Sequence, residues 1–199
     1  MKLYFAPGAC SLVPHILLEE LNLTHELEQV DLKAKLTKSG ADFLAINSKG
    51  YVPALALDNG HVLTEVSVLA QYLCDQRPEA GLIPASGEAR YQLLSLLVYI
   101  STEIHKPMGS LFNPNASEDA RKATQALLTR RLNWIAAELG DKNYLTGSYS
   151  AADAYLFTVL NWARLVHFDM TPWPTLQALG ARVAQRPAVQ RAMQAEGLL

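Results

Sequence analysis

The chain has 199 residues, of which half are hydrophobic and 18% are charged, and its formal net charge is −2. This composition is typical of a folded globular protein, and without a basic run nothing electrostatic points to nucleic acid. Two cysteines, Cys10 and Cys74, are too few for a disulfide framework and suit a reducing compartment. No apolar run reaches membrane-spanning length and Pro7-Gly8 interrupts the apolar start, so we expect a cytoplasmic protein without a signal peptide.

The N-terminal part of the chain alternates strand-type and helix-type patterns. A predicted strand at residues 2–6 runs into Pro7-Gly8, and a helix follows at 11–21. Residues 26–32 alternate polar and apolar side chains, as a strand with one buried face does. The lysine-rich segment 33–38 is a poor strand and a poor core helix, so it is predicted to be a loop.

A hairpin follows a short predicted helix at 41–46. Its two apolar runs, 51–57 and 61–63, are joined by Asp58-Asn59-Gly60, a sequence typical of a tight turn. The next helix is predicted from Thr64-Glu65 to residue 73. The order of strands and helices predicts an α/β unit of about the size of thioredoxin.

The remaining residues are predicted to be helical. Residues 78–87 are rich in Pro, Gly and Ala and are predicted to link an α/β domain at 1–77 to an all-helical domain at 88–199. The helices are expected at 88–112 with a bend near Pro107, at about 117–139, from Ser150, after Pro172 or Pro174, and after Pro187.

Two features of the helical part have alternative interpretations. Between Leu93 and Ile100 the helix is apolar on nearly every side, which indicates either a subunit interface or, more commonly, deep burial. Ser150 and Asp153 have the spacing of a capping box, for which we prefer a purely structural role.

Cys10 stands where the first strand turns into the first helix. The unpaired N–H groups and the positive dipole of a helix start favour a thiolate there. A free cysteine is also often a small buried core residue. Taken alone, this segment leaves both interpretations open.

In order and spacing, the motifs of the whole chain resemble the glutathione transferases, and most closely the bacterial beta class. The residues that carry the resemblance are APGACSLVPHI, DFLAINSKGYVPAL, DNGHVLTE, Glu103-Ile104-His105-Lys106, SAADAYLFT and RPAVQ. The resemblance implies a thioredoxin-like N-terminal domain followed by an all-α domain, assembled as a homodimer, with glutathione in the cleft between the domains. Glutathione would be the co-substrate, with no other cofactor and no metal.

The resemblance also implies which residues act. Cys10 would lie at the glutathione sulfur, and His105 would face the active site from the second domain. The Val52–Pro53 bond would be cis and would expose the Val52 backbone to the peptide of glutathione, while Glu65 would hold its γ-glutamyl end. The other implied binding residues are Ser11, Lys35, Pro53, Val66 through its backbone amide, Thr102, Lys106 and Trp162.

Several of these residues also have bland interpretations. A loop lysine such as Lys35 is usually a solvated charge, a helical histidine is more often structural, and Trp162 is equally well a core aromatic. Glu65 could simply complement a helix dipole.

The sequence departs from the family pattern at three places. Val66 offers no hydroxyl after Glu65, Val98 replaces an asparagine of some relatives, and no second cysteine stands in CxxC spacing with Cys10. A dithiol mechanism of the thioredoxin kind is therefore excluded.

Three functions are compatible with this sequence. The first is conjugation of the glutathione thiolate to small hydrophobic electrophiles. The second is a redox activity in which Cys10 forms a mixed disulfide with glutathione, which a second glutathione resolves. The third is a non-catalytic carrier of hydrophobic ligands, which the retained set of implied glutathione residues argues against. Whether Cys10 activates the glutathione sulfur or bonds to it stays undecided at this level.

Overall fold

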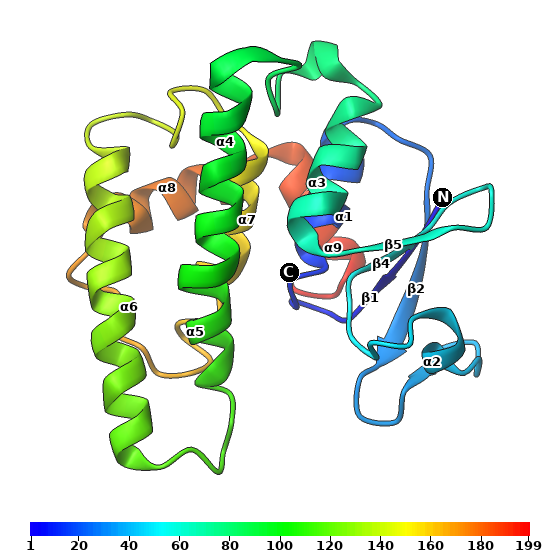
Figure 1. The fold of residues 1–199 in the computed structure, drawn as a ribbon, viewed down its shortest axis with the longest axis horizontal. Coiled ribbons are helices and arrows are strands. Elements are labelled where there is room, and N and C mark those ends of the chain that lie inside the picture. The colour runs from blue at the N-terminus through cyan, green and yellow to red at the C-terminus, as the bar shows by residue number, and fades with distance from the viewer. The chain divides into compact units, whose positions relative to one another are not determined.

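The computed structural model describes residues 1–199, which form two compact units (Figure 1). The first unit consists of Met1–Ile83 together with Gln185–Leu199, and the second of Pro84–Ala184. The predicted linker at 78–87 holds a 3₁₀ turn at Pro78–Ala80, and Leu82 and Ile83 are buried. The units therefore divide at Ile83, and the last residues, predicted to belong to the helical domain, lie in the first unit.

A five-stranded mixed sheet forms the centre of the first unit, in the order β3-β2-β1-β4-β5. β1 pairs in parallel with β2, and the other neighbouring pairs are antiparallel. The two-residue strand β3 lies inside the segment predicted to be a loop; its backbone pairs with Val30 and Asp31 although its composition is not strand-like. The strands are β1 Lys2–Phe5, β2 Glu26–Asp31, β3 Leu36–Thr37, β4 Ala54–Ala56 and β5 Val62–Thr64.

Helices cover both faces of this sheet. Figure 1 shows α1 (Leu12–Glu20), α3 (Val66–Asp75) and α9 (Pro187–Ala195) together on one side and α2 (Phe43–Ile46) on the other. Phe43 of α2 is fully buried in a cluster with Val30, Val52 and Ala54. This burial fixes the backbone on which part of the candidate site is built.

The C-terminal helix α9 belongs to the first unit because it packs on α1. Its residues Ala188, Val189 and Ala192 are buried. Arg186 makes a bidentate ion pair with Glu20 of α1, with nitrogen–oxygen distances of 2.6 and 2.9 Å. Such a paired fork geometry is stronger than a single surface ion pair, and the sequence alone gave no sign of it.

The second unit is entirely helical, as expected. Its long predicted helix is divided by a π-helical turn at Ile100–His105, which ends two residues before Pro107. Proline has no N–H to donate, and its ring would clash with the carbonyl four residues back, so the regular ladder cannot continue through it. The helices are α4 Gly87–Tyr99, α5 Lys106–Ser110, α6 Glu118–Leu139, α7 Ala151–Leu160 and α8 Pro174–Ala184.

The predicted capping box is present at the start of α7. The fully buried Asp153 carboxylate accepts from the Ser150 N–H at 2.9 Å, from its hydroxyl at 2.7 Å and from the Leu145 N–H at 2.8 Å. Burial raises the pKa of Asp153, and these hydrogen bonds oppose the rise. The network starts a helix that is buried on nearly all sides.

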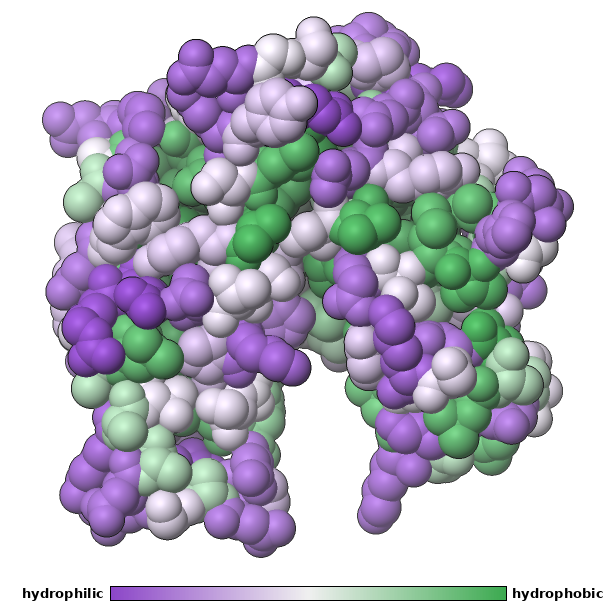
Figure 2. Space-filling model, viewed as in Figure 1, coloured by the Kyte–Doolittle hydropathy of each residue, from purple (hydrophilic) through white to green (hydrophobic).

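The apolar segment around α4 is only partly buried. Leu93, Leu97 and Ile100 are buried in the unit, whereas Tyr91 and Val98 are exposed. Figure 2 shows hydrophobic residues in a strip along this helix. None of the helices combines the length and the hydrophobicity that crossing a bilayer requires.

Candidate active site

The turn that carries Cys10 is held by its own backbone and by the end of the chain. Gly8 has a positive φ of 69°, which a residue with a side chain rarely adopts. Its N–H donates to Glu196 Oε2 at 2.8 Å. The Ser11 hydroxyl accepts from the Ala6 N–H and donates to the Ala6 carbonyl, both at 3.2 Å. Ser11 is fully buried, and its hydroxyl stabilises the turn.

Cys10 is a half-buried thiol at the start of α1. Its Sγ donates to the Val52 carbonyl at 3.3 Å. The pKa of this thiol is raised from 9.0 to about 12: burial is the main cause, the N–H groups of Cys10 and Ser11 act to lower it, and the nearby Glu65 carboxylate adds to the rise. The helix start thus acts on the sulfur as expected, but the cost of burying a charge outweighs it. The side chain is a neutral hydrogen-bond donor.

The segment before β4 lies next to this thiol. The Val52–Pro53 peptide bond is cis, as the family resemblance implied, and both residues are buried. Lys35, whose φ is 60°, donates its Nζ to the Gly50 carbonyl at 2.6 Å. The lysine is therefore not a freely solvated charge: it lies against the same segment as Val52.

Glu65 occupies a strained position immediately before α3. Its φ is 71°, in the region that favours glycine, and such strain persists only where the surroundings enforce it. Its Oε1 accepts from Lys49 Nζ at 2.7 Å and from the Tyr51 hydroxyl at 3.0 Å. The side chain of Val66 is buried, so this residue can offer a ligand only its backbone.

The helical unit brings together a second set of candidates. His105 Nδ1 lies 2.7 Å from the Tyr155 hydroxyl, and the Trp162 ring stands edge-on to the histidine at a centroid distance of 5.0 Å. Trp162 is buried, which fits an aromatic core as well as a site wall. Thr102 and Lys106 are exposed, and the Thr102 hydroxyl donates to the Val98 carbonyl of its own helix at 3.1 Å.

Sequence reasoning missed three residues that shape these sites: Lys49, Tyr155 and Glu196. Lys49 is one of several lysines in polar segments and Tyr155 lies in an apolar run, so neither carried a signal. Glu196 is a buried carboxylate in the first unit, 188 residues from its partner Gly8. Contacts at that separation have no local sequence pattern.

Two family models match the chain. They describe the N-terminal domain of glutathione S-transferase, over residues 8–76, and its C-terminal domain, over residues 118–195. The chain belongs to the glutathione S-transferase family. The predicted family, fold and class of enzyme are therefore confirmed.

Full-length relatives agree with this assignment. The chain is 42% identical to glutathione S-transferase GstA of Escherichia coli O157:H7, with all of both chains covered. It is similar to a bacterial beta class glutathione S-transferase of Sphingomonas chungbukensis, with a TM-score of 0.95 and 42% identity over all of both chains. A sphingomonad glutathione S-transferase complexed with glutathione has a TM-score of 0.94 and 43% identity, again with both chains fully covered.

Proposed function

We propose that this glutathione S-transferase conjugates the thiolate of glutathione to small hydrophobic electrophiles. The observation that carries the proposal is the state of Cys10, a protonated thiol with its sulfur beside the Val52 carbonyl and the first N–H groups of α1. Such a group donates a hydrogen bond to a bound thiolate and does not compete with it as a nucleophile. Glutathione is the co-substrate, and the proposal requires no other cofactor.

The energy needed at the glutathione sulfur is modest. A free thiol has a pKa of about 8.5, and lowering it by about two units takes roughly 2.7 kcal/mol. A hydrogen bond to a charged group contributes about 1.5–3 kcal/mol. The Cys10 thiol together with one backbone N–H of Cys10 or Ser11 therefore suffices, and the buried Ser11 hydroxyl is not needed.

Charged groups of the first unit are proposed to bind the ends of glutathione. Glu65 meets the γ-glutamyl ammonium, and the Val66 N–H at the start of α3 donates to the γ-glutamyl carboxylate, because a helix N-terminus favours an anion. Lys35 meets the glycine carboxylate. The Val52 backbone, next to Pro53, pairs with the peptide between these ends. Lys49 holds the Glu65 carboxylate in place at 2.7 Å.

The helical unit is proposed to act on the electrophile. His105, held by Tyr155 at 2.7 Å, is a hydrogen-bond or proton-transfer group, and Trp162 supplies an apolar surface beside it. The exposed Lys106 and Thr102 add a positive charge and a hydroxyl. In this scheme Cys10 and His105 are the catalytic residues, and variants of His105 are expected to change electrophile preference more than glutathione affinity.

The mixed-disulfide alternative is less well supported. Its first step is attack of a Cys10 thiolate on glutathione disulfide, and burial keeps Cys10 in the unreactive thiol form. Intact mass spectrometry after incubation with glutathione disulfide tests it. A reductant-sensitive glutathione adduct on most molecules would favour the redox function.

We also propose a homodimer in a reducing compartment such as the cytoplasm. The exposed residues Tyr91 and Val98 of α4 support a second copy packing on this helix, because a monomer leaves them in water. Neither cysteine forms a disulfide. Val98→Asp, compared with an exposed control such as Gln92→Glu, is expected to lower the mass measured by light scattering from dimer to monomer.

A substrate panel tests the central proposal. Purified protein is assayed with glutathione and a set of electrophiles that begins with a chloronitrobenzene, and retention on immobilised glutathione is measured in parallel. Turnover of at least one electrophile supports the proposal. Retention without turnover of any electrophile would instead support a non-catalytic binder.

A further inference from the structure

Three side chains of the first unit converge where α1 meets the start of β2. His15 and Glu19 lie one helical turn apart on α1, and His25 directly precedes β2. One ligand atom from each residue lies within 4.8 Å of those of the other two. The proposed transferase chemistry uses none of them. Their spacing in the sequence, H-x₃-E-x₅-H, is a signal that the sequence analysis overlooked.

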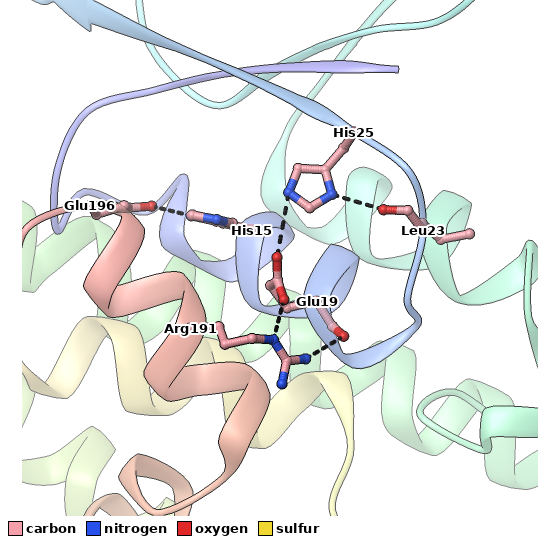
Figure 3. A network of polar contacts seen from close by, with 6 residues as sticks. All are labelled: His15, Glu19, Leu23, His25, Arg191 and Glu196. Carbon is pink, nitrogen blue, oxygen red and sulfur yellow. Dashed lines mark hydrogen bonds and ion pairs between the residues drawn. The ribbon is translucent and has the colours of Figure 1, made fainter.

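One ring nitrogen of His15, Nε2, has no hydrogen-bond partner in the protein. Its side chain is fully buried, and Nδ1 lies 2.8 Å from Glu196 Oε1 (Figure 3). Because a carboxylate oxygen accepts, Nδ1 holds the proton and Nε2 bears a lone pair in the neutral ring. This Nε2 is buried and has no hydrogen-bond partner. Buried polar atoms without a partner are rare in folded proteins, so the lone pair of this atom is a candidate metal ligand.

His25 is oriented in the same way. Its Nδ1 lies 2.8 Å from the Leu23 carbonyl, which can only accept, so the lone pair of the neutral ring is again on Nε2. Nε2 lies 3.7 Å from Glu19 Oε1, too far for a hydrogen bond. These two atoms form an ion pair only if His25 is protonated; with a neutral ring, the Nε2 lone pair faces Oε1 at a distance that a bound cation would bridge.

Arg191 fixes the carboxylate. Its Nε donates to Glu19 Oε2 at 2.6 Å, and a second nitrogen donates to the Glu19 backbone carbonyl at 3.2 Å. This leaves Oε1 directed at His25 (Figure 3). The guanidinium charge also opposes a cation at Glu19, so we expect weaker binding than in a closed site of four protein ligands.

We propose that His15 Nε2, Glu19 Oε1 and His25 Nε2 bind a divalent transition-metal cation such as Zn²⁺. Two imidazoles and one carboxylate are a donor set that Zn²⁺ accepts with a fourth position left for water. With bonds of about 2.0–2.1 Å, two ligands of a tetrahedral site lie roughly 3.4 Å apart, close to the 3.7 Å between Glu19 and His25. Glu196 and Leu23 orient the imidazoles as outer partners.

The proposed metal site is accessible from solvent, and a bound cation would connect two segments of the first unit. The Glu19 and His25 side chains are 23% and 12% exposed, so a cation enters past them, whereas His15 forms the buried wall. A bound cation would join α1 to the segment that leads into β2. Mg²⁺ and Ca²⁺ prefer sets of oxygen ligands and are expected not to compete.

Calorimetric titration of the glutathione-free protein with Zn²⁺, in a buffer without thiols, tests the proposal. The wild type is expected to bind one equivalent through this site, and His25→Ala and Glu19→Gln to lose at least tenfold in affinity for it. His61→Ala removes an exposed histidine outside the cluster and is the matched control. At about 100-fold excess over Kd, Zn²⁺ should raise the Tm of the wild type by roughly 5 °C or more, and that of His25→Ala much less.

Co²⁺ in place of Zn²⁺ distinguishes this site from adventitious binding at Cys10. The expected spectrum has the visible bands of a four-coordinate ion without a thiolate charge-transfer band. Circular dichroism and the Tm without metal show whether each variant is folded, and Glu19→Gln replaces His25→Ala if the latter is not. Zn²⁺ binding that is absent from the wild type, or unchanged in a folded His25→Ala or Glu19→Gln variant, would overturn the proposal.

Discussion

The two ends of the proposed glutathione site in the first unit differ in how they handle charge. At Glu65 a carboxylate, the Lys49 ammonium and the Tyr51 hydroxyl form a polar cluster, with the Lys49 and Glu65 side chains about half exposed. At Cys10 the sulfur donates to a backbone carbonyl, and burial keeps the thiol protonated. One end carries full charges in contact with water, and the other carries none.

This difference suggests a division of labour. An exposed charged end can recognise the charged ends of a peptide at little desolvation cost, but water and salt screen it. An uncharged, water-poor end strengthens each hydrogen bond to the one anion placed there. Glutathione affinity should therefore depend on Glu65, and reactivity of its sulfur on Cys10.

The largest effect is expected for Glu65→Gln. Loss of a charge-assisted hydrogen bond of about 2 kcal/mol should raise the KM for glutathione roughly 30-fold, with kcat nearly unchanged. Steady-state kinetics with glutathione varied at a fixed electrophile measure this, and Glu79→Gln, an exposed acidic residue elsewhere, is the control. A KM within twofold of the wild-type value would show that Glu65 does not hold the ligand.

Cys10→Ala should change kcat and not the KM for glutathione. Loss of one donor to the thiolate, worth about 1.4 kcal/mol, should lower kcat about tenfold at neutral pH and raise the apparent pKa of bound glutathione by about one unit. The KM for glutathione should stay close to that of the wild type. Cys10→Ser retains a donor and should keep most of the rate. An equal loss in Cys10→Ser and Cys10→Ala would mean that sulfur chemistry, not hydrogen bonding, is required.

Ionic strength should have the smallest effect on the kinetics. It should change the KM for glutathione, which depends on the Glu65 end, and not kcat, which depends on the Cys10 end. Because the Debye length falls from about 10 Å at 0.1 M to about 3 Å at 1 M salt, screening should raise the KM for glutathione roughly threefold over that range. At saturating glutathione kcat should change little, because burial, which salt does not screen, affects the Cys10 pKa more than the Glu65 charge does. The measurement is kinetics in potassium chloride, with sucrose of equal osmolality as the control. A kcat that falls with salt while KM stays constant would reverse the assignment.

Local patterns predicted most of the fold. The hairpin at Asp58-Asn59-Gly60 and the capping box at Ser150 and Asp153 depend on neighbours in the chain, and both are present. β3 and the place of α9 depend on partners far away: Leu36 and Thr37 become a strand only by pairing with β2, and α9 joins the first unit through buried alanines and the pair of Arg186 with Glu20. The local amino-acid sequence does not indicate which distant residues these segments contact.

For the candidate site, the sequence predicts the local setting of Cys10 but not its protonation. Cys10 at a strand–helix turn is visible in the sequence, but the direction of its pKa is not, because the dipole and the burial act in opposite senses and only the structure shows which is larger. The contact of Ser11 with glutathione stays a prediction; the sequence did not indicate that its hydroxyl bonds to the Ala6 backbone. Glu196 was missed because its partner Gly8 is distant in the chain. Lys49 was missed because it is one of several lysines in polar segments.

The protonation of Cys10 tests the central claim most directly. Glutathione-free protein is alkylated with iodoacetamide at a series of pH values, and the rate of labelling at Cys10 is followed by peptide mass spectrometry. Because burial raises the pKa of this thiol above its ordinary value of 9.0, labelling should be slow at neutral pH and should still increase as the pH passes that value. A rate that reaches a plateau near neutral pH would show a stable thiolate and would contradict the proposed role as a neutral donor.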